Sequence, residues 1–120
     1  MKNNQVIGEQ MRGHPQITPF RLRVFKALLE VPCGYVTTYG ALAARVGCGS
    51  PRAIGGALRN NPLAPAVPCH RVVAGNLTIG GFSGQRSGEM IEKKRALLQA
   101  EGVHFGANQR VEARALWQWI

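Results

Sequence analysis

The sequence has few acidic residues: six Asp and Glu stand against fifteen Lys and Arg among 120 residues, for a formal net charge of +9. An excess of this size points to a polyanionic partner. Charge alone leaves nucleic acid, an anionic membrane and the ribosome open. A basic protein that binds no polyanion is the remaining alternative.

Long hydrophobic runs and paired cysteines are also missing. No run approaches the roughly 20 apolar residues that span a bilayer, and the first ten residues lack the hydrophobic segment of a signal peptide. We therefore expect a cytoplasmic protein with no membrane partner. Cys33, Cys48 and Cys69 form an odd set without a C-x-x-C pair. This pattern argues against a disulfide framework and a cysteine-rich zinc site, so at least one thiol should be free.

A hydrophobic content of 45% in a chain of this length fits one domain with one core. Residues 1–17 are polar with little periodicity, which predicts a flexible leader before a single domain at 18–120. The first helix is predicted to begin at Pro19, capped by Thr18, and to end before Pro32. Its apolar stripe comprises Phe20, Val24, Phe25, Leu28 and Leu29.

Two further helices are predicted at residues 39–46 and 51–60, separated only by the glycine-containing turn 47–49. Thr38 and Ser50 are the expected caps, and Gly47 should close the first of the two. The second carries Arg52 and Arg59. Such a pair is a helix-turn-helix pattern, which commonly presents one helix to a DNA groove. Ordinary packing of two helices in a core is the alternative.

The rest of the chain predicts one short extended segment and one longer helix. Residues 66–73 are apolar at both ends and read as a buried extended segment interrupted by Pro68. A helix should run from about 89 to 101 and close at Gly102. Its expected inner face consists of Met90 or Ile91, Lys94, Leu97 and Leu98. We therefore predict a mostly α-helical fold with short extended segments around a helix-turn-helix.

The run Pro68-Cys69-His70-Arg71 offers chemistry, because a cysteine is nucleophilic as the thiolate and a nearby imidazole can accept its proton. Successive side chains of an extended segment point to opposite faces, so we expect a water to connect Cys69 with His70. A carboxylate that orients the imidazole would complete the relay. Glu101 is our choice among the six acids. The alternative is a small buried thiol beside a satisfied core histidine.

These motifs resemble the catalytic domain of the O6-alkylguanine-DNA alkyltransferases, over residues 20–105. The resemblance rests on six blocks in family order, far more than one short motif could carry. The blocks are Thr38-Tyr39-Gly40, Arg52-Ala53-Ile54-Gly55-Gly56, Asn61-Pro62, Pro68-Cys69-His70-Arg71-Val72, Gly80-Gly81-Phe82-Ser83-Gly84 and Leu97-Leu98-Gln99-Ala100-Glu101-Gly102.

The resemblance implies a helix-turn-helix, winged-helix-like domain that carries the reactive cysteine and acts on double-stranded DNA containing O6-alkylguanine. Cys69 would accept the alkyl group once and irreversibly, activated through water, His70 and Glu101. Tyr39 would help rotate the damaged nucleotide out of the duplex, and Arg52 would fill its place. No cofactor and no metal are implied, and we expect a monomer associated with DNA.

The remaining implied roles concern the DNA interface and the base pocket. Ala53, Gly55 and Gly56 would let the recognition helix approach the minor groove closely, and Arg59 would contact phosphate. Close packing against another helix is the alternative reason for the two glycines. Asn61 would brace the turn before the active site. The pocket is implied to be formed by the Val72 and Cys69 carbonyls, the Ser83 hydroxyl and the Phe82 ring, where a tyrosine is common.

Two other functions stay open. The short chain and the segment from Val111 to Trp117 are similar to the alkyltransferase-like proteins, which bind alkylated guanine and flag it for excision-repair proteins. Those proteins have tryptophan in place of the acceptor, so Cys69 favours transfer. A thiol hydrolase is the second alternative, but it gives no reason for the helix-turn-helix or for Arg52. We interpret Cys33 and Cys48 as structural.

Overall fold

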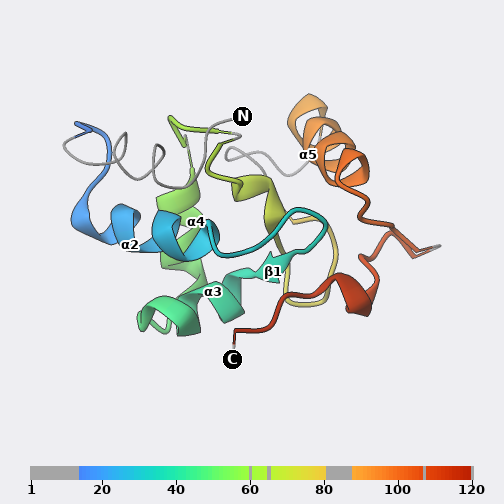
Figure 1. The fold of residues 1–120 in the computed structure, drawn as a ribbon, viewed down its shortest axis with the longest axis horizontal. Helices are drawn as coiled ribbons and strands as arrows, with labels where there is room; N and C mark the ends of the chain where they lie inside the picture. Colours follow the sequence, from blue (N-terminus) through green and yellow to red (C-terminus); the bar gives the residue numbers. More distant parts are fainter. Residues whose placement is uncertain (1–13, 60, 65, 81–87, 107, 120) are drawn as a thin grey trace.

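The computed structural model describes residues 14–59, 61–64, 66–80, 88–106 and 108–119 (Figure 1). The predicted fold class, mostly helical with short extended segments, is confirmed. Most of the predicted leader, residues 1–13, lies outside the described residues. Among the residues described, no helix is both long and apolar enough to cross a membrane. The elements in chain order are α2 (Pro19–Leu28), β1 (Thr37–Thr38), α3 (Tyr39–Val46), α4 (Pro51–Leu58), η1 (Cys69–Arg71), β2 (Val72–Val73), α5 (Glu89–Ala100) and η2 (Ala113–Ala115).

The helix-turn-helix is present, and local signals define its boundaries. The Thr38 hydroxyl accepts from Ala41 N at 3.0 Å and begins α3, and the Ser50 hydroxyl accepts from Ala53 N at 3.2 Å and begins α4. Gly47 and Gly49 have φ of 75° and 64°, a left-handed conformation that glycine adopts without steric cost. They turn the chain sharply between the two helices, and α2 packs against both.

Helix α4 ends earlier than predicted, at Leu58 rather than near residue 60. Arg59 is extended, with ψ of 134°. The reason is a contact from outside the helix: Arg21 of α2 donates from Nε to Ala57 O at 2.9 Å and from Nη2 to Arg59 O at 3.0 Å. The guanidinium therefore satisfies carbonyls that further helical turns would otherwise bond.

The prediction of an extended segment over residues 66–73 is wrong for its central part. Pro68 has φ of −83° and ψ of 66°, and Cys69 N donates to Val67 O at 2.9 Å, which together form an inverse γ-turn. A 3₁₀ turn, η1, follows. Only β2 is extended, and it pairs in parallel with β1. The expectation that Cys69 and His70 point to opposite faces of a strand therefore does not apply.

Helix α5 lies on the other side of η1 from the helix-turn-helix (Figure 1). Its buried residues are Ile91, Lys94 and Leu98, all on the predicted inner face, whereas Leu97 of that face is only half-buried. It ends one residue before the predicted Glu101, which is its C-cap. Gly102, with φ of 89°, closes it, and Val103 N donates to Leu98 O at 3.0 Å.

The core has two parts that meet at β2. The side chains of the two-residue strand point to opposite faces. Val72 packs in the cluster formed by α2, α3 and α4, whereas Val73 packs with Leu98 and Val103 beside α5. The C-terminal segment runs along β1, where Trp117 N donates to Val36 O at 2.7 Å. The turn that carries Cys69 is thus held between both parts of the core.

Candidate active site

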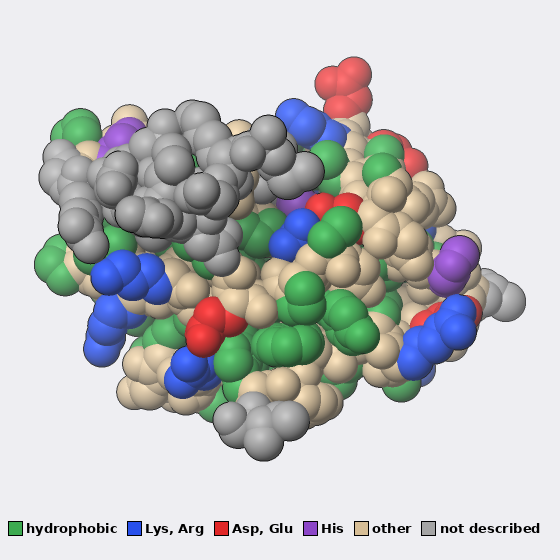
Figure 2. All heavy atoms as spheres, viewed as in Figure 1, with side chains coloured by type: hydrophobic (Ala, Val, Ile, Leu, Met, Phe, Trp, Pro, Cys, Tyr) green, Lys and Arg blue, Asp and Glu red, His purple; other side chains and the backbone are tan. Residues whose placement is uncertain are grey.

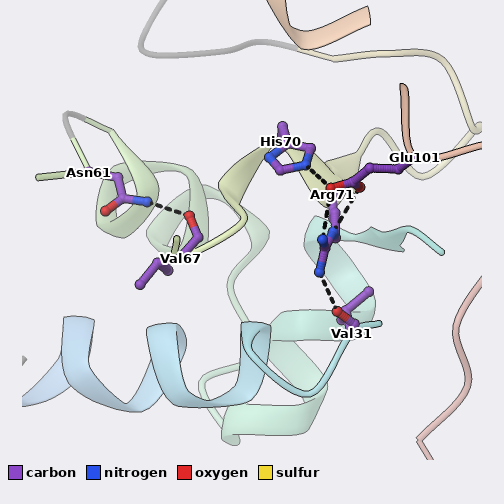
Figure 3. Close-up of polar contacts among 6 residues, drawn as sticks. All are labelled: Val31, Asn61, Val67, His70, Arg71 and Glu101. Carbon is purple, nitrogen blue, oxygen red and sulfur yellow. Dashed lines mark hydrogen bonds and ion pairs between the residues drawn. The ribbon is translucent and has the colours of Figure 1, made fainter. Parts of the chain in front are cut away.

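Cys69 lies in a turn that Asn61 braces. The Asn61 Nδ2 atom donates to Val67 O at 2.9 Å (Figure 3). Its Oδ1 atom accepts from Leu63 N at 2.8 Å. Val67 O also accepts from Cys69 N. One side chain therefore ties the segment after α4 to the residues just before the thiol. Only 8% of Cys69 is exposed.

The surroundings of Cys69 make its thiol harder to ionise. Burial raises its pKa, whereas a hydrogen bond with Asn61 and the charge of Lys94 lower it; the net shift is upward. Lys94 is fully buried, and its Nζ donates to Val72 O at 2.7 Å. Burial lowers the pKa of Lys94 to about 8. Because the thiol pKa is raised, nucleophilic chemistry at Cys69 needs a base.

The structure brings His70 and Glu101 together. His70 Nε2 lies 3.0 Å from Glu101 Oε2. Burial raises the pKa of Glu101, but the hydrogen bonds from Arg71 and His70 outweigh burial, so the pKa of Glu101 is lowered. An ionised carboxylate only accepts, so Nε2 carries the hydrogen and Nδ1 carries a lone pair. Burial lowers the pKa of His70, although Glu101 opposes this. Buried Nδ1 has no hydrogen-bond partner among the described residues and is available as a base.

Arg71 is a member of this cluster that the sequence analysis did not assign. Its Nε and Nη2 atoms donate to the two carboxylate oxygens of Glu101 at 2.9 and 2.7 Å, and its Nη1 donates to Val31 O at 2.8 Å. Figure 3 shows His70 and Arg71 converging on Glu101. The signal in the sequence was the position of Arg71 directly after the Cys69-His70 pair. For Lys94, also unassigned, the signal was a charged residue on an otherwise apolar helix face.

Apart from Tyr39, the predicted DNA-binding residues lie on α4 and at its C-cap, Arg59, and none of them is buried. Arg52, Gly56 and Arg59 are exposed, and Ala53 and Gly55 are half-buried. A Cβ atom added at Gly55 or Gly56 would meet nothing within 4 Å in the described part of the chain. Among the described residues, close helix packing therefore does not account for these glycines. The inner side of α4 is formed by Ile54, Ala57 and Leu58.

Tyr39 begins α3 and lies near the buried amine of α5. A Cβ atom at Gly80 would be 3.5 Å from Tyr39 Cε2 and 3.7 Å from Lys94 Nζ. The Val72 carbonyl already accepts from Lys94, which leaves one lone pair for another donor. Phe82 and Ser83 lie outside the described residues.

The other two cysteines differ in placement. All three thiols are free. Cys48 is half-buried against the core, but Cys33 is exposed, so the structural role expected of Cys33 is wrong. Within the described ranges, no group of three or more His, Cys or Glu side chains is placed to hold a metal ion.

Positive charge lies on both sides of the face drawn in Figure 2. The face drawn in Figure 2 has a hydrophobic area in its lower centre, with Lys and Arg side chains at both its left and right margins. Beside α4, an open hollow of about 440 Å³ is lined by Gln16, Arg21, Gly56 and Arg59. Its two arginines suit an anionic group.

The comparisons with known proteins agree on one family. A methylated-DNA–protein-cysteine methyltransferase of Saccharolobus islandicus is 49% identical over 85 residues, which are 71% of this chain and 52% of that protein. The structure of Mycobacterium tuberculosis OGT in complex with DNA is 44% identical, with a TM-score of 0.57, and the match covers 70% of this chain and 50% of that one. The chain thus spans about half the length of these relatives.

A shorter protein is matched over nearly all of its length. Schizosaccharomyces pombe Atl1, in complex with damaged DNA containing O6-carboxymethylguanine, is 28% identical with a TM-score of 0.67; the match covers 82% of this chain and 94% of Atl1. The family description "6-O-methylguanine DNA methyltransferase, DNA binding domain" matches residues 19–103, which include α2 to α5, Cys69 and Glu101. This chain therefore belongs to the 6-O-methylguanine DNA methyltransferase family, of which it contains the DNA-binding domain.

Proposed function

We propose that this chain repairs alkylated DNA directly, by moving the alkyl group from O6 of guanine in duplex DNA to Cys69 in a single turnover. Residues 18–120 would do this as one monomeric domain, associated with DNA in the cytoplasm and without a cofactor. The observation that carries the proposal is the Glu101–His70 hydrogen bond, which leaves Nδ1 of His70 as a proton acceptor in the turn of Cys69.

The chemistry follows from these positions. His70 takes the Cys69 proton through a bridging water, and Glu101 stabilises the imidazolium that forms. The thiolate sulfur then attacks the alkyl carbon: the S–C bond forms, the C–O6 bond breaks, and the guanine leaves as its anion and gains a proton. The thioether has no route back to a thiol, so each molecule reacts once.

Reaction requires that the base leave the stack, because O6 lies inside the duplex. In our proposal α4 enters the minor groove, where Ala53, Gly55 and Gly56 allow close approach. Arg52 fills the place of the extruded base, and Tyr39 crowds the neighbouring phosphate. Arg59 and the hollow that it lines with Arg21 bind phosphate.

The pocket for the extruded guanine is the remaining part of the proposal. The carbonyls of Val72 and Cys69 would accept from the guanine amino group. Ser83 would donate to O6, and Phe82 would form an aromatic wall. The free lone pair on the Val72 carbonyl is compatible with this role.

A second function, a lesion sensor that binds O6-alkylguanine and recruits excision-repair proteins, is favoured by one observation. The TM-score to Atl1 is 0.67, whereas the TM-score to Mycobacterium tuberculosis OGT is 0.57. The buried thiol with a base beside it favours transfer, since a sensor that only binds needs neither.

The test is the intact mass of the protein after incubation with a duplex carrying one O6-methylguanine. We expect a gain of one CH₂ group in the wild type and in a Cys33→Ser/Cys48→Ser double variant. Cys69→Ser should gain no mass yet still bind the duplex. Tight binding by the wild type with unchanged mass would establish the sensor instead. A mass gain that survives in Cys69→Ser would move the acceptor to another residue.

A further inference from the structure

We propose that Arg71 is a positioning residue of the relay: its guanidinium holds the Glu101 carboxylate in the orientation that accepts from His70, and its charge, beside the shared carboxylate, disfavours protonation of His70. The effect on alkyl transfer rests on the proposed function. The effect on His70 does not, because it can be measured without DNA.

The geometry gives Arg71 control over the carboxylate. Two of its nitrogen atoms bond the two oxygens of Glu101 at 2.9 and 2.7 Å, which fixes the plane of the carboxylate. Glu101 Oε2 is shared, because it lies 2.7 Å from Arg71 Nη2 and 3.0 Å from His70 Nε2. The third nitrogen bonds Val31 O at 2.8 Å. Arg71 thereby ties η1 both to the end of α5 and to the segment after α2.

The position of Glu101 makes this support necessary. Glu101 is the C-cap of α5, where the partial negative charge of a helix end disfavours a carboxylate. It is also only 17% exposed, so water screens it poorly. Arg71 supplies the compensating charge. Its own side chain is 16% exposed, so the pair is largely removed from water.

The second effect concerns the charge of His70. The charged and titratable groups that act on the imidazole are Glu101, Arg71 and Lys94, and Cys69 precedes it in η1. Glu101 raises the pKa of His70, and both cations lower it. Burial has the largest effect and also lowers the pKa of His70. Removing Arg71 would therefore shift the balance toward the imidazolium by leaving the effect of Glu101 less opposed. An imidazolium carries hydrogen on Nδ1 and has no lone pair with which to accept the Cys69 proton.

The experiment measures the titration midpoint of His70 by NMR in the full chain without DNA. Arg71→Met should shift the midpoint upward. The pH at which the transfer rate falls to half should move up by the same amount. Arg45→Met is the matched control, because Arg45 forms an exposed two-bond pair with Glu30 at 3.0 and 3.2 Å. It removes the same charge, and we expect it to leave the midpoint of His70 unchanged.

The conservative variant Arg71→Lys separates charge from geometry. An ammonium group keeps the charge but cannot reproduce the planar fork on Glu101. We expect a His70 midpoint close to that of the wild type and slower transfer at every pH. Circular dichroism shows whether Arg71→Met folds. If it does not fold, Arg71→Lys tests the positioning role by itself, and a wild-type transfer rate in Arg71→Lys would then overturn the proposal.

An unshifted His70 midpoint in folded Arg71→Met overturns the proposed electrostatic role. If the wild type transfers no alkyl group, the proposed function fails, while the NMR midpoints still test whether Arg71 disfavours protonation of His70. The two failures are therefore distinguishable.

Discussion

At the scale of single residues, the reactivity of Cys69 depends on opposing effects of burial and charge. Lys94 opposes the upward shift that burial causes in the pKa of Cys69. In a Cys33→Ser/Cys48→Ser background, where Cys69 is the sole thiol, Lys94→Met should therefore raise the pKa of Cys69 further. The pH dependence of thiolate absorbance measures it. Lys93→Met, at an exposed position on the same helix, is the control. An unmoved midpoint in Lys94→Met would mean that its charge does not reach the sulfur.

His70 links the active site to stability. Burial lowers its pKa in the folded protein, so the unfolded chain binds more protons once the pH falls below the ordinary value of about 6.5. The free energy of unfolding should therefore decrease as the pH falls from 6.5 through the lowered pKa, and should be fully retained above about 6.5. Urea unfolding at about pH 7.5 and 5.5 tests this sign.

The matching variants are His70→Gln and His104→Gln. His70→Gln should lose much of the pH dependence over this range, because glutamine does not titrate. His104 is exposed, so its substitution should leave the dependence as in the wild type. Equal pH dependence in wild type and His70→Gln would contradict the assignment.

At the scale of elements, α4 contains two glycines that lower its own helical stability. Glycine inside a helix costs about 1 kcal/mol relative to alanine, and neither Gly55 nor Gly56 meets a neighbour in the described chain that would forbid a methyl group. Gly55→Ala and Gly56→Ala should each raise the free energy of unfolding by up to about 1 kcal/mol and weaken binding to duplex DNA.

Thermal unfolding and fluorescence anisotropy measure the two effects. Gly75→Ala is the control, since it adds a methyl group to open space outside α4 and should leave DNA binding unchanged. Loss of stability in the α4 variants would restore a packing role for the glycines, and unchanged DNA affinity would remove α4 from the interface.

The elements also show what the sequence can predict. The starts of α3 and α4 were predictable because Thr38 and Ser50 act on residues three positions away. The end of α4 and the turn at Cys69 were not, because they depend on Arg21 and Asn61 reaching distant carbonyls. The chain has only six acids, and Glu101 could be chosen among them because it stands at the end of a predicted apolar helix, just before Gly102. No neighbouring residue in the sequence indicated that Arg71 would bind the same carboxylate as His70.

At the scale of the whole molecule, the net charge of +9 should make DNA affinity fall steeply with salt, because each phosphate contact releases counterions. Arg59→Gln should reduce the slope of log K against log salt by about 1. Arg114→Gln removes the same charge from η2, away from α4 in Figure 1, and should leave the slope unchanged. Equal slopes for Arg59→Gln and the wild type would remove Arg59 from the phosphate contacts.

The most direct test of the central claim is the number of alkyl groups transferred per protein molecule in a titration with a duplex containing O6-methylguanine, with the modified residue located by peptide mapping. Irreversible transfer to Cys69 predicts a plateau at one group per molecule, all of it on the peptide that contains Cys69. A plateau at zero with the duplex bound would show a lesion sensor, and demethylation beyond one equivalent would show turnover. Either result would contradict the account.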